Sequence, residues 1–104
     1  MRCRNCSPLP EQVRVVADLL ERRWTISILF ASHEGAVRFN EFLQVLGRVP
    51  PATLTSRLAE LERAGVLERK VIDSRPPLVE YRLTPRGHQL RSLMTELARF
   101  AQTS

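Results

Sequence analysis

The sequence predicts a mostly helical α+β domain with a single two-stranded β-hairpin. Apolar residues recur at helical spacing from residue 11 to residue 63 and again after residue 84. Between these stretches, residues 67–71 and 79–83 alternate apolar and polar side chains, which is the period of a half-buried strand. A chain of 104 residues builds one hydrophobic core, so we expect one domain over residues 11–104 and a flexible segment over residues 1–10.

The first two helices are predicted from apolar spacing and from the residues at their ends. The first covers residues 11–23, and its apolar face carries Val13, Val16 and Leu20. The second begins near Thr25, which we interpret as its N-cap, and ends before Gly35. We interpret Trp24, at the junction, as an anchor that packs between the two helices.

Two further helices follow a short extended segment at residues 36–38. The third is predicted over residues 39–46, and the fourth over residues 52–63. A tight connection joins them, because residues 47–51 contain Gly47 and two prolines. The buried side of the fourth helix is predicted from its leucines, which are Leu54, Leu58 and Leu61.

The hairpin and the last helix complete the pattern. The loop at residues 73–77 is rich in turn-forming residues and joins the two strands. Thr84 followed by Pro85 marks the start of the last helix. This order of elements predicts a winged helix-turn-helix, in which the third and fourth helices form the helix-turn-helix and the hairpin is the wing.

Charge and side-chain type indicate duplex DNA as the partner. The net charge is +5, and arginine supplies nearly all of the basic residues. Arginine binds phosphate and guanine in a bidentate way, although a GC-rich genome also enriches it. The fourth helix would enter the major groove, where small side chains allow a close approach. We predict DNA contacts from the following residues of this helix, of the wing and of the start of the third helix: Arg38, Asn40, Ala52, Thr53, Thr55, Ser56, Arg57, Arg63, Arg69, Lys70 and Arg75.

Four sequence runs in this order resemble the HxlR family of bacterial regulators, which is related to the MarR-type regulators. They are RRWTISIL at 22–29, RFNEF at 38–42, TLTSRLAELERAGVL at 53–67 and VEYRLTPRG at 79–87. The resemblance covers about residues 11–101 and implies a winged-helix homodimer that binds a near-palindromic operator. Two positions depart from the family: Pro50 replaces a common capping serine, and Glu11 lies where many members have a cysteine.

The two cysteines, Cys3 and Cys6, leave a redox role open. Two thiols without nearby histidines do not complete a zinc site, and a disulfide framework is implausible in a cytoplasmic chain, so we expect no metal and no cofactor. Arg2 and Arg4 would lower the pKa of a neighbouring thiol, so both cysteines could react, and the alternative is a disordered tail with incidental thiols. Because the cysteines lie upstream of the position that the family uses, that role is not carried over from the resemblance.

The terminal helices are predicted to form a dimer interface. The apolar stripe of the last helix is too broad for the core of one small domain, and pairing would bury it. We therefore expect N- and C-terminal dimerisation helices, with contacts from Val13, Val16, Leu20, Leu90, Leu93, Leu97 and Phe100.

Together these patterns predict a sequence-specific double-stranded DNA-binding transcriptional regulator, which we expect to act as a repressor and a homodimer. The alternatives are a thiol-based redox-sensing regulator and a winged-helix module that binds protein without specific DNA binding. The sequence contains no nucleophile elbow, phosphate-binding glycine loop or metal-spaced His/Glu set, so we expect no enzyme. No apolar stretch is long enough for a membrane span, and we expect a cytoplasmic protein. The sequence does not identify an effector, whether a small molecule or an oxidant.

Overall fold

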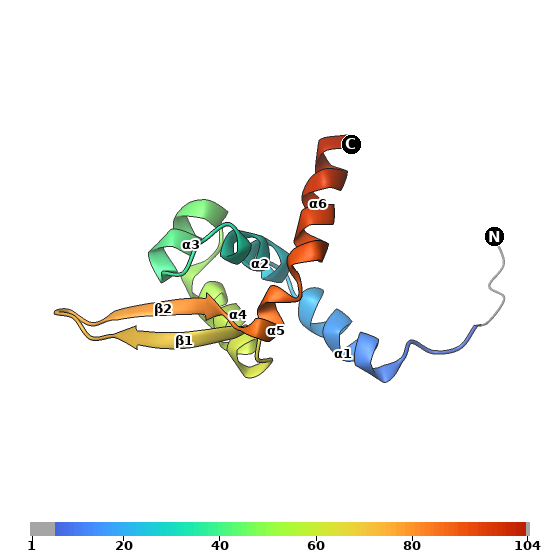
Figure 1. The fold of residues 1–104 in the computed structure, drawn as a ribbon, viewed down its shortest axis with the longest axis horizontal. Helices are drawn as coiled ribbons and strands as arrows, with labels where there is room; N and C mark the ends of the chain where they lie inside the picture. Colours follow the sequence, from blue (N-terminus) through green and yellow to red (C-terminus); the bar gives the residue numbers. More distant parts are fainter. Residues whose placement is uncertain (1–5, 104) are drawn as a thin grey trace.

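The computed structural model describes residues 6–103 and has the predicted order of elements (Figure 1). Helices α2, α3 and α4 form the body of the molecule, and the β1–β2 hairpin projects from one side of it. Helices α1 and α6 project from the body away from the hairpin. The elements are α1 (Glu11–Leu20), α2 (Thr25–His33), α3 (Phe39–Leu46), α4 (Pro51–Arg63), β1 (Leu67–Ile72), β2 (Leu78–Leu83), α5 (Pro85–His88) and α6 (Arg91–Thr103).

The hairpin is antiparallel and pairs Leu67 with Leu83 at its base and Ile72 with Leu78 near its loop. Each strand is one residue longer than predicted, at the loop end. The amide of Tyr81 donates a 2.7 Å hydrogen bond to the carbonyl of Val37, which ties the extended segment before α3 to β2. The wing is therefore attached to the body at the segment that leads into the helix-turn-helix.

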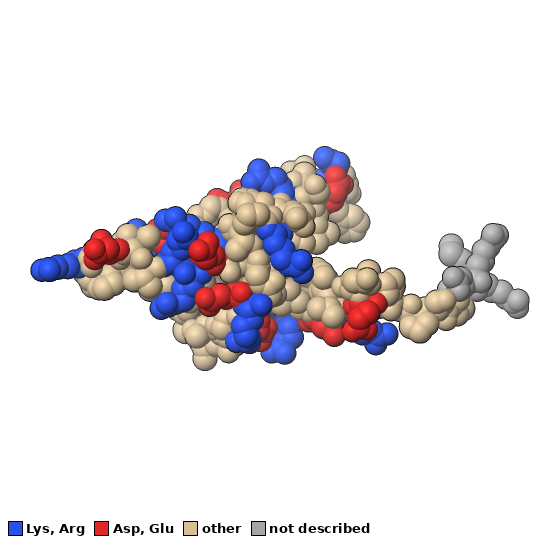
Figure 2. Space-filling view, turned by 60° about the horizontal axis from the view of Figure 1, so that its bottom comes forward, with Lys and Arg blue, Asp and Glu red and all other residues tan. Residues whose placement is uncertain are grey.

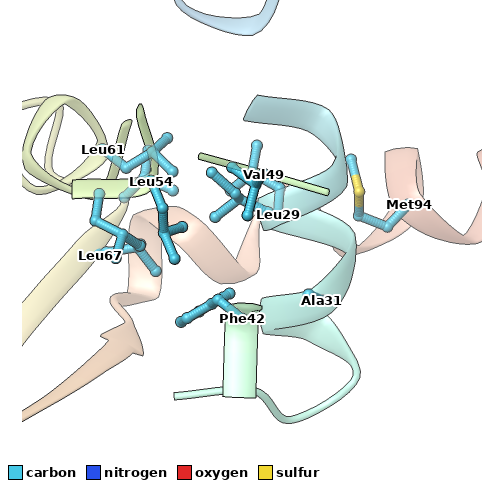
Figure 3. Packing of buried hydrophobic residues seen from close by; sticks show 11 residues of the cluster. Leu29, Ala31, Phe42, Val49, Leu54, Leu61, Leu67 and Met94 are labelled. Carbon is cyan, nitrogen blue, oxygen red and sulfur yellow. The ribbon is translucent and has the colours of Figure 1, made fainter. Parts of the chain in front are cut away.

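The core lies where α2 meets α3, α4 and the base of the hairpin (Figure 3). Helix α2 is apolar on nearly all sides, as expected for a helix that its neighbours surround. The predicted leucine stripe of α4 is confirmed, because Leu54, Leu58 and Leu61 are fully buried. Phe42 of α3 packs into the same cluster. This stripe fixes which face of α4 points outward.

The junction between α1 and α2 differs from the prediction. Helix α1 ends at Leu20 rather than at residue 23, and Trp24 takes a left-handed conformation, with φ of 81°. The N-cap of α2 is Trp24, so the prediction that Thr25 is the cap is wrong. Thr25 is the first helical residue and is buried, at 1% exposure. Trp24 packs against the core, which confirms it as an anchor.

The last helix is divided into two. Thr84 caps α5 as predicted, since its hydroxyl accepts a 3.0 Å hydrogen bond from the amide of Gly87. The chain turns at Gln89 and Leu90 before α6 begins. Gly87 is buried where α5 meets the carbonyl of Val66, at the start of β1. None of the helices in the 6–103 range combines the length and the apolarity needed to cross a bilayer.

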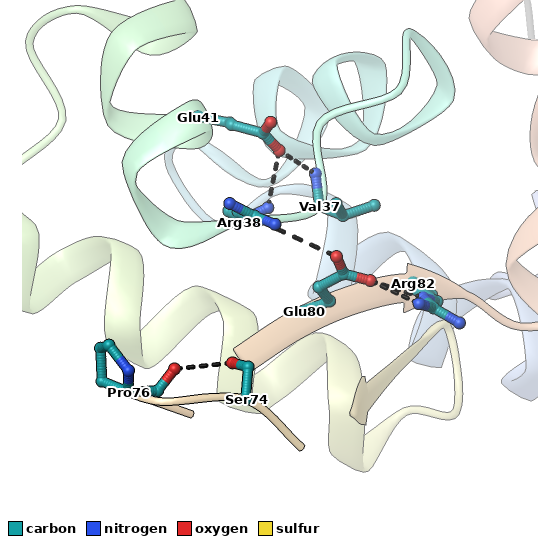
Figure 4. Close-up of polar contacts among 7 residues, drawn as sticks. All are labelled: Val37, Arg38, Glu41, Ser74, Pro76, Glu80 and Arg82. Atoms are coloured by element: carbon teal, nitrogen blue, oxygen red, sulfur yellow. Dashed lines mark hydrogen bonds and ion pairs between the residues drawn. The ribbon is translucent and has the colours of Figure 1, made fainter. Parts of the chain in front are cut away.

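Glu41 caps the start of α3 (Figure 4). Its carboxylate accepts hydrogen bonds of 2.9 Å from the amides of Val37 and Arg38. Asn40 is the second residue of α3 and is not its cap. The two amide hydrogen bonds, together with the Arg38 charge, lower the pKa of Glu41 below its ordinary value of 4.5. The Glu41 carboxylate therefore occupies two amides at the start of α3 that an anion could otherwise bind.

We expect acid stability to depend on Glu41. Because its pKa is lower in the folded state than in the unfolded state, its contribution is complete above the ordinary pKa and disappears as the pH falls through the folded pKa. Glu41→Gln should therefore unfold at lower denaturant concentration than wild type at neutral pH, and the difference should shrink as the pH falls below 4.5. Urea titrations over this range measure it, and a constant difference would contradict the assignment.

Candidate nucleic-acid interface

The outer face of α4 is exposed and carries small side chains. Ala52, Ser56 and Arg63 lie opposite the buried leucines, and all three are exposed. The Thr55 hydroxyl is also exposed but donates a 3.0 Å hydrogen bond to the carbonyl of Pro51. Two polar groups of this face therefore remain available to a partner. They are the Ser56 hydroxyl in the middle of the helix and the Arg63 guanidinium at its end.

Arg57 lies on the flank of α4 and turns toward the protein. Its Nε donates a 2.9 Å hydrogen bond to the carbonyl of Arg23, and its Nη1 lies 3.2 Å from Glu60 Oε2. The same carboxylate oxygen lies 3.1 Å from Arg22 Nη2. The Arg57 side chain is only 14% exposed. Arg57, which the sequence indicates as a DNA contact, thus joins α4 to the α1–α2 junction through its Nε and pairs with Glu60 of its own helix through its Nη1.

A hollow of about 340 Å³ lies at the N-terminal end of α4. Its lining contains three arginines, a tryptophan ring, a proline and a threonine, which are Arg23, Trp24, Arg48, Pro50, Thr53 and Arg57. The sequence-based site omits Arg23 and Arg48. Their positions in the sequence could have indicated them. Each lies just before the start of a helix, where the helix favours a bound anion that an arginine can also contact.

The hairpin presents a second group of cations. Arg69, Lys70 and Arg75 are exposed, and the last of them lies in the loop between the strands. Lys70 has an acidic neighbour, at 3.7 Å from Glu68. Basic side chains occupy the tip of the hairpin and gather over the body of the molecule, with acidic side chains among them (Figure 2). The wing thus has a basic tip, as predicted.

Arg38 is engaged within the protein. Its Nε lies 3.8 Å from Glu80 Oε2, and the other Glu80 oxygen pairs with Arg82 at 2.6 Å (Figure 4). Glu80 belongs to β2, so its pair with Arg38 connects the start of α3 to the wing. Arg38 is still about half exposed. Its contacts orient the wing relative to the helix-turn-helix.

The residues predicted for dimerisation form an unpartnered apolar surface on α1 and α6. Phe100 is 71% exposed, and Val13, Leu93 and Leu97 are exposed by 39–50%. Val16, Leu20 and Leu90 are partly buried and line a hollow of about 160 Å³ between α1 and the α5–α6 corner. A surface of this kind favours association with another protein chain.

One of the two cysteines lies within the described residues. Cys3 lies outside the described residues, and Cys6 is exposed, five residues before α1 begins. Within residues 6–103, no three His, Cys, Asp or Glu side chains gather in a way that could hold a metal ion.

Comparison with known proteins decides the family. The model of the HxlR-like helix-turn-helix family matches residues 19–104. The chain belongs to this HxlR-like family. One relative, the uncharacterized HTH-type transcriptional regulator YvaP of Bacillus subtilis, is 34% identical over 93% of this chain and 90% of its own length. YodB of B. subtilis, named an HTH-type transcriptional regulator, is 32% identical over 81% of this chain and 75% of its own.

Solved structures agree with the HxlR-like fold. The redox regulator HypR in its oxidized form superposes with a TM-score of 0.82 and 29% identity, over 89% of this chain and 96% of that one. The reduced form of the transcriptional regulator YodB from B. subtilis superposes with a TM-score of 0.79 and 29% identity, over 90% and 92%. The resemblance seen in the sequence and the winged helix-turn-helix fold are both confirmed. Transcriptional regulation with a DNA-binding helix-turn-helix is the function of this HxlR-like chain.

Proposed function

We propose that this HxlR-like protein is a sequence-specific double-stranded DNA-binding repressor that acts in the cytoplasm as a homodimer on a near-palindromic operator. One observation carries the proposal. The outer face of α4 is exposed and built from small side chains, and a hairpin with exposed Arg69, Lys70 and Arg75 follows it directly. The proposal assigns no catalytic step to the chain.

The geometry supports a division of roles between helix and wing. The major groove admits an α-helix, and Ala52, Ser56 and Ala59 have little side-chain bulk to hold α4 away from the base edges. The Ser56 hydroxyl and the Arg63 guanidinium can then bond base edges or phosphates. Arg75, at the hairpin loop, can enter an adjacent minor groove, where narrow A·T-rich segments concentrate negative potential.

The homodimer is supported by the apolar surface of α1 and α6. A two-fold interface brings the same patch of each protomer together, so one exposed stripe on α6 can serve both copies. In this arrangement a side chain of one protomer would fill the 160 Å³ hollow beside Val16, Leu20 and Leu90 of the other. Two recognition helices about 34 Å apart would then reach successive major grooves of a palindrome.

Ser56→Glu is expected to weaken operator binding about thirtyfold, which corresponds to about 2 kcal/mol. The added carboxylate would stand among the phosphates and base edges that α4 faces. Fluorescence anisotropy with an operator duplex, selected from a random-sequence library with the wild-type protein, measures the effect. The matched control is Ser92→Glu, which adds the same charge at an exposed position of α6.

The outcome of this test separates the competing functions. Equal affinity of Ser56→Glu and wild type would remove α4 from the interface, and failure to select any sequence would favour the module that binds protein. The similarity to HypR is the observation that favours thiol-based redox sensing. Repeating the titration with a thiol oxidant, for wild type and Cys6→Ser, tests that alternative. Reporter expression with and without the regulator establishes whether it represses.

A further inference from the structure

We propose that the hollow at the start of α4 is a phosphate-binding site that holds a backbone phosphate of the DNA. Arg23 and Arg48 would supply the charge, and the Thr53 hydroxyl would supply a further hydrogen bond. The inference rests on the proposed function and makes it more specific, because it assigns the backbone contact of the recognition helix to residues outside its groove-facing side.

Three guanidinium groups line this hollow, and the protein neutralises only one of them. Glu60 pairs with Arg57 at 3.2 Å and with Arg22 at 3.1 Å. In the part of the chain that the structure describes, neither Arg23 nor Arg48 has a carboxylate within ion-pair distance. Two unpaired cations beside one hollow repel each other, and an anion between them would relieve that repulsion. Their fixed, directional donors suit phosphate oxygens in particular.

The hollow is held in shape before any ligand arrives. The hydrogen bond from Arg57 Nε to the Arg23 carbonyl fixes α4 against the segment that carries Arg23. The Arg23 guanidinium lies over the Trp24 ring, 5.1 Å from its centroid. Trp24 is itself anchored in the core. An anion entering the hollow would therefore meet in Arg23 a cation whose position is already restricted, which lowers the entropic cost of binding.

The first turn of α4 adds hydrogen-bond donors at the same place. The first amides of an α-helix have no acceptor within the helix. Pro50 and Pro51 carry no N–H, so the free donors of this turn are the amides of Ala52 and Thr53, and Pro50 provides no side-chain cap for them. Thr53, in this turn, lines the hollow with Arg48 from the preceding connection. In a duplex whose major groove holds α4, backbone phosphates border the groove on both sides of the helix. Phosphate of the DNA backbone is therefore the source that we infer.

The test is the salt dependence of operator binding. Each phosphate contact that is lost should flatten the slope of log K against log salt by about 0.9. Because the dimer would lose one contact in each half-site, we expect Arg23→Gln with Arg48→Gln to flatten the slope by about 1.8 and to weaken binding at least tenfold at low salt. The matched control is Arg14→Gln with Arg91→Gln, which removes the same charge from exposed positions on α1 and α6. Circular dichroism of each variant verifies the fold.

A second measurement locates the phosphate. Operators carrying one neutral methylphosphonate at successive positions should reveal a position in each half-site that weakens wild type tenfold and leaves the double variant unaffected. Wild-type binding to the operator with an unchanged slope in the double variant would overturn the inference and leave the proposed function standing. A wild-type protein that binds no duplex would overturn the proposed function and the inferred DNA source together.

Free phosphate shares the chemistry of this site, so it needs its own measurement. Inorganic phosphate, compared with chloride at equal ionic strength, should raise the unfolding temperature of wild type very little, because a single anion lacks the other contacts of the duplex. If inorganic phosphate stabilises wild type but not the double variant, and the salt slope does not change, the hollow binds a free anion instead. That result would overturn the assignment to DNA.

Discussion

The double substitution Leu97→Glu with Phe100→Glu is expected to convert the protein to a monomer and to weaken operator binding about a thousandfold. Both side chains belong to the exposed apolar stripe of α6, so the change costs the isolated protomer little. In a dimer, however, four carboxylates would have to be buried around the two-fold axis. In a dimer, binding of one protomer to its half-site holds the other protomer at high effective concentration near the second half-site. Separate protomers lose this advantage.

Light scattering at micromolar protein and anisotropy on full and half operators measure these two effects. Ser92→Glu with Gln102→Glu adds the same charge to exposed positions of α6 beside the stripe, and this control should remain dimeric. Half-site affinity should be similar in all three proteins, because α4 and the wing are untouched. A double variant that is still dimeric, or a monomeric wild type, would show that α6 does not mediate the assembly.

Gly87→Ala is expected to lower the free energy of unfolding by about 3 kcal/mol. In most helices this substitution is favourable, because alanine is the better helix former. Here the added Cβ would lie 2.2 Å from the carbonyl oxygen of Val66 and 3.0 Å from Leu83 Cδ2. The Val66 carbonyl accepts a 3.1 Å hydrogen bond from the Thr84 amide, so moving it would disturb the base of the hairpin as well.

Chemical denaturation monitored by the single tryptophan measures this loss of stability. Gly35→Ala is the informative comparison, since Gly35 has φ of +110° but open space where its Cβ would lie. That variant suffers backbone strain alone, which we expect to cost about 1–2 kcal/mol. A Gly87→Ala protein as stable as wild type would mean that α5 does not approach Val66 as closely as the structure shows.

The sequence predicted those elements whose apolar periodicity is strong and whose ends carry clear signals. Helix α3 has the predicted bounds, and α4 differs by one residue at its start. The leucines of α4 identified its buried face, and therefore the outward positions of Ala52 and Ser56. In each case the buried face is specified by residues of the same helix, so local spacing was sufficient.

The errors arise where contacts between distant residues decide the conformation. Apolar spacing continues beyond Leu20, but the left-handed conformation of Trp24 separates α1 from α2. The break after α5 accompanies a close approach between Gly87 and Val66, which no local pattern reveals. The contact of Arg57 with the carbonyl of Arg23 joins residues 34 positions apart, so local spacing could not reveal it, and the DNA contact of Arg57 stays a prediction.

The hairpin lies on the side of the body away from α1 and α6, and this separation has a consequence for the length of DNA that the assembly would cover (Figure 1). If two copies join through those helices, their hairpins come to lie at the two outer extremities of the complex. Protection from hydroxyl radicals should then extend past both recognised half-sites into the flanking sequence. Shortening the loop around Arg75 should trim that protection at both ends and leave the centre of the footprint unchanged.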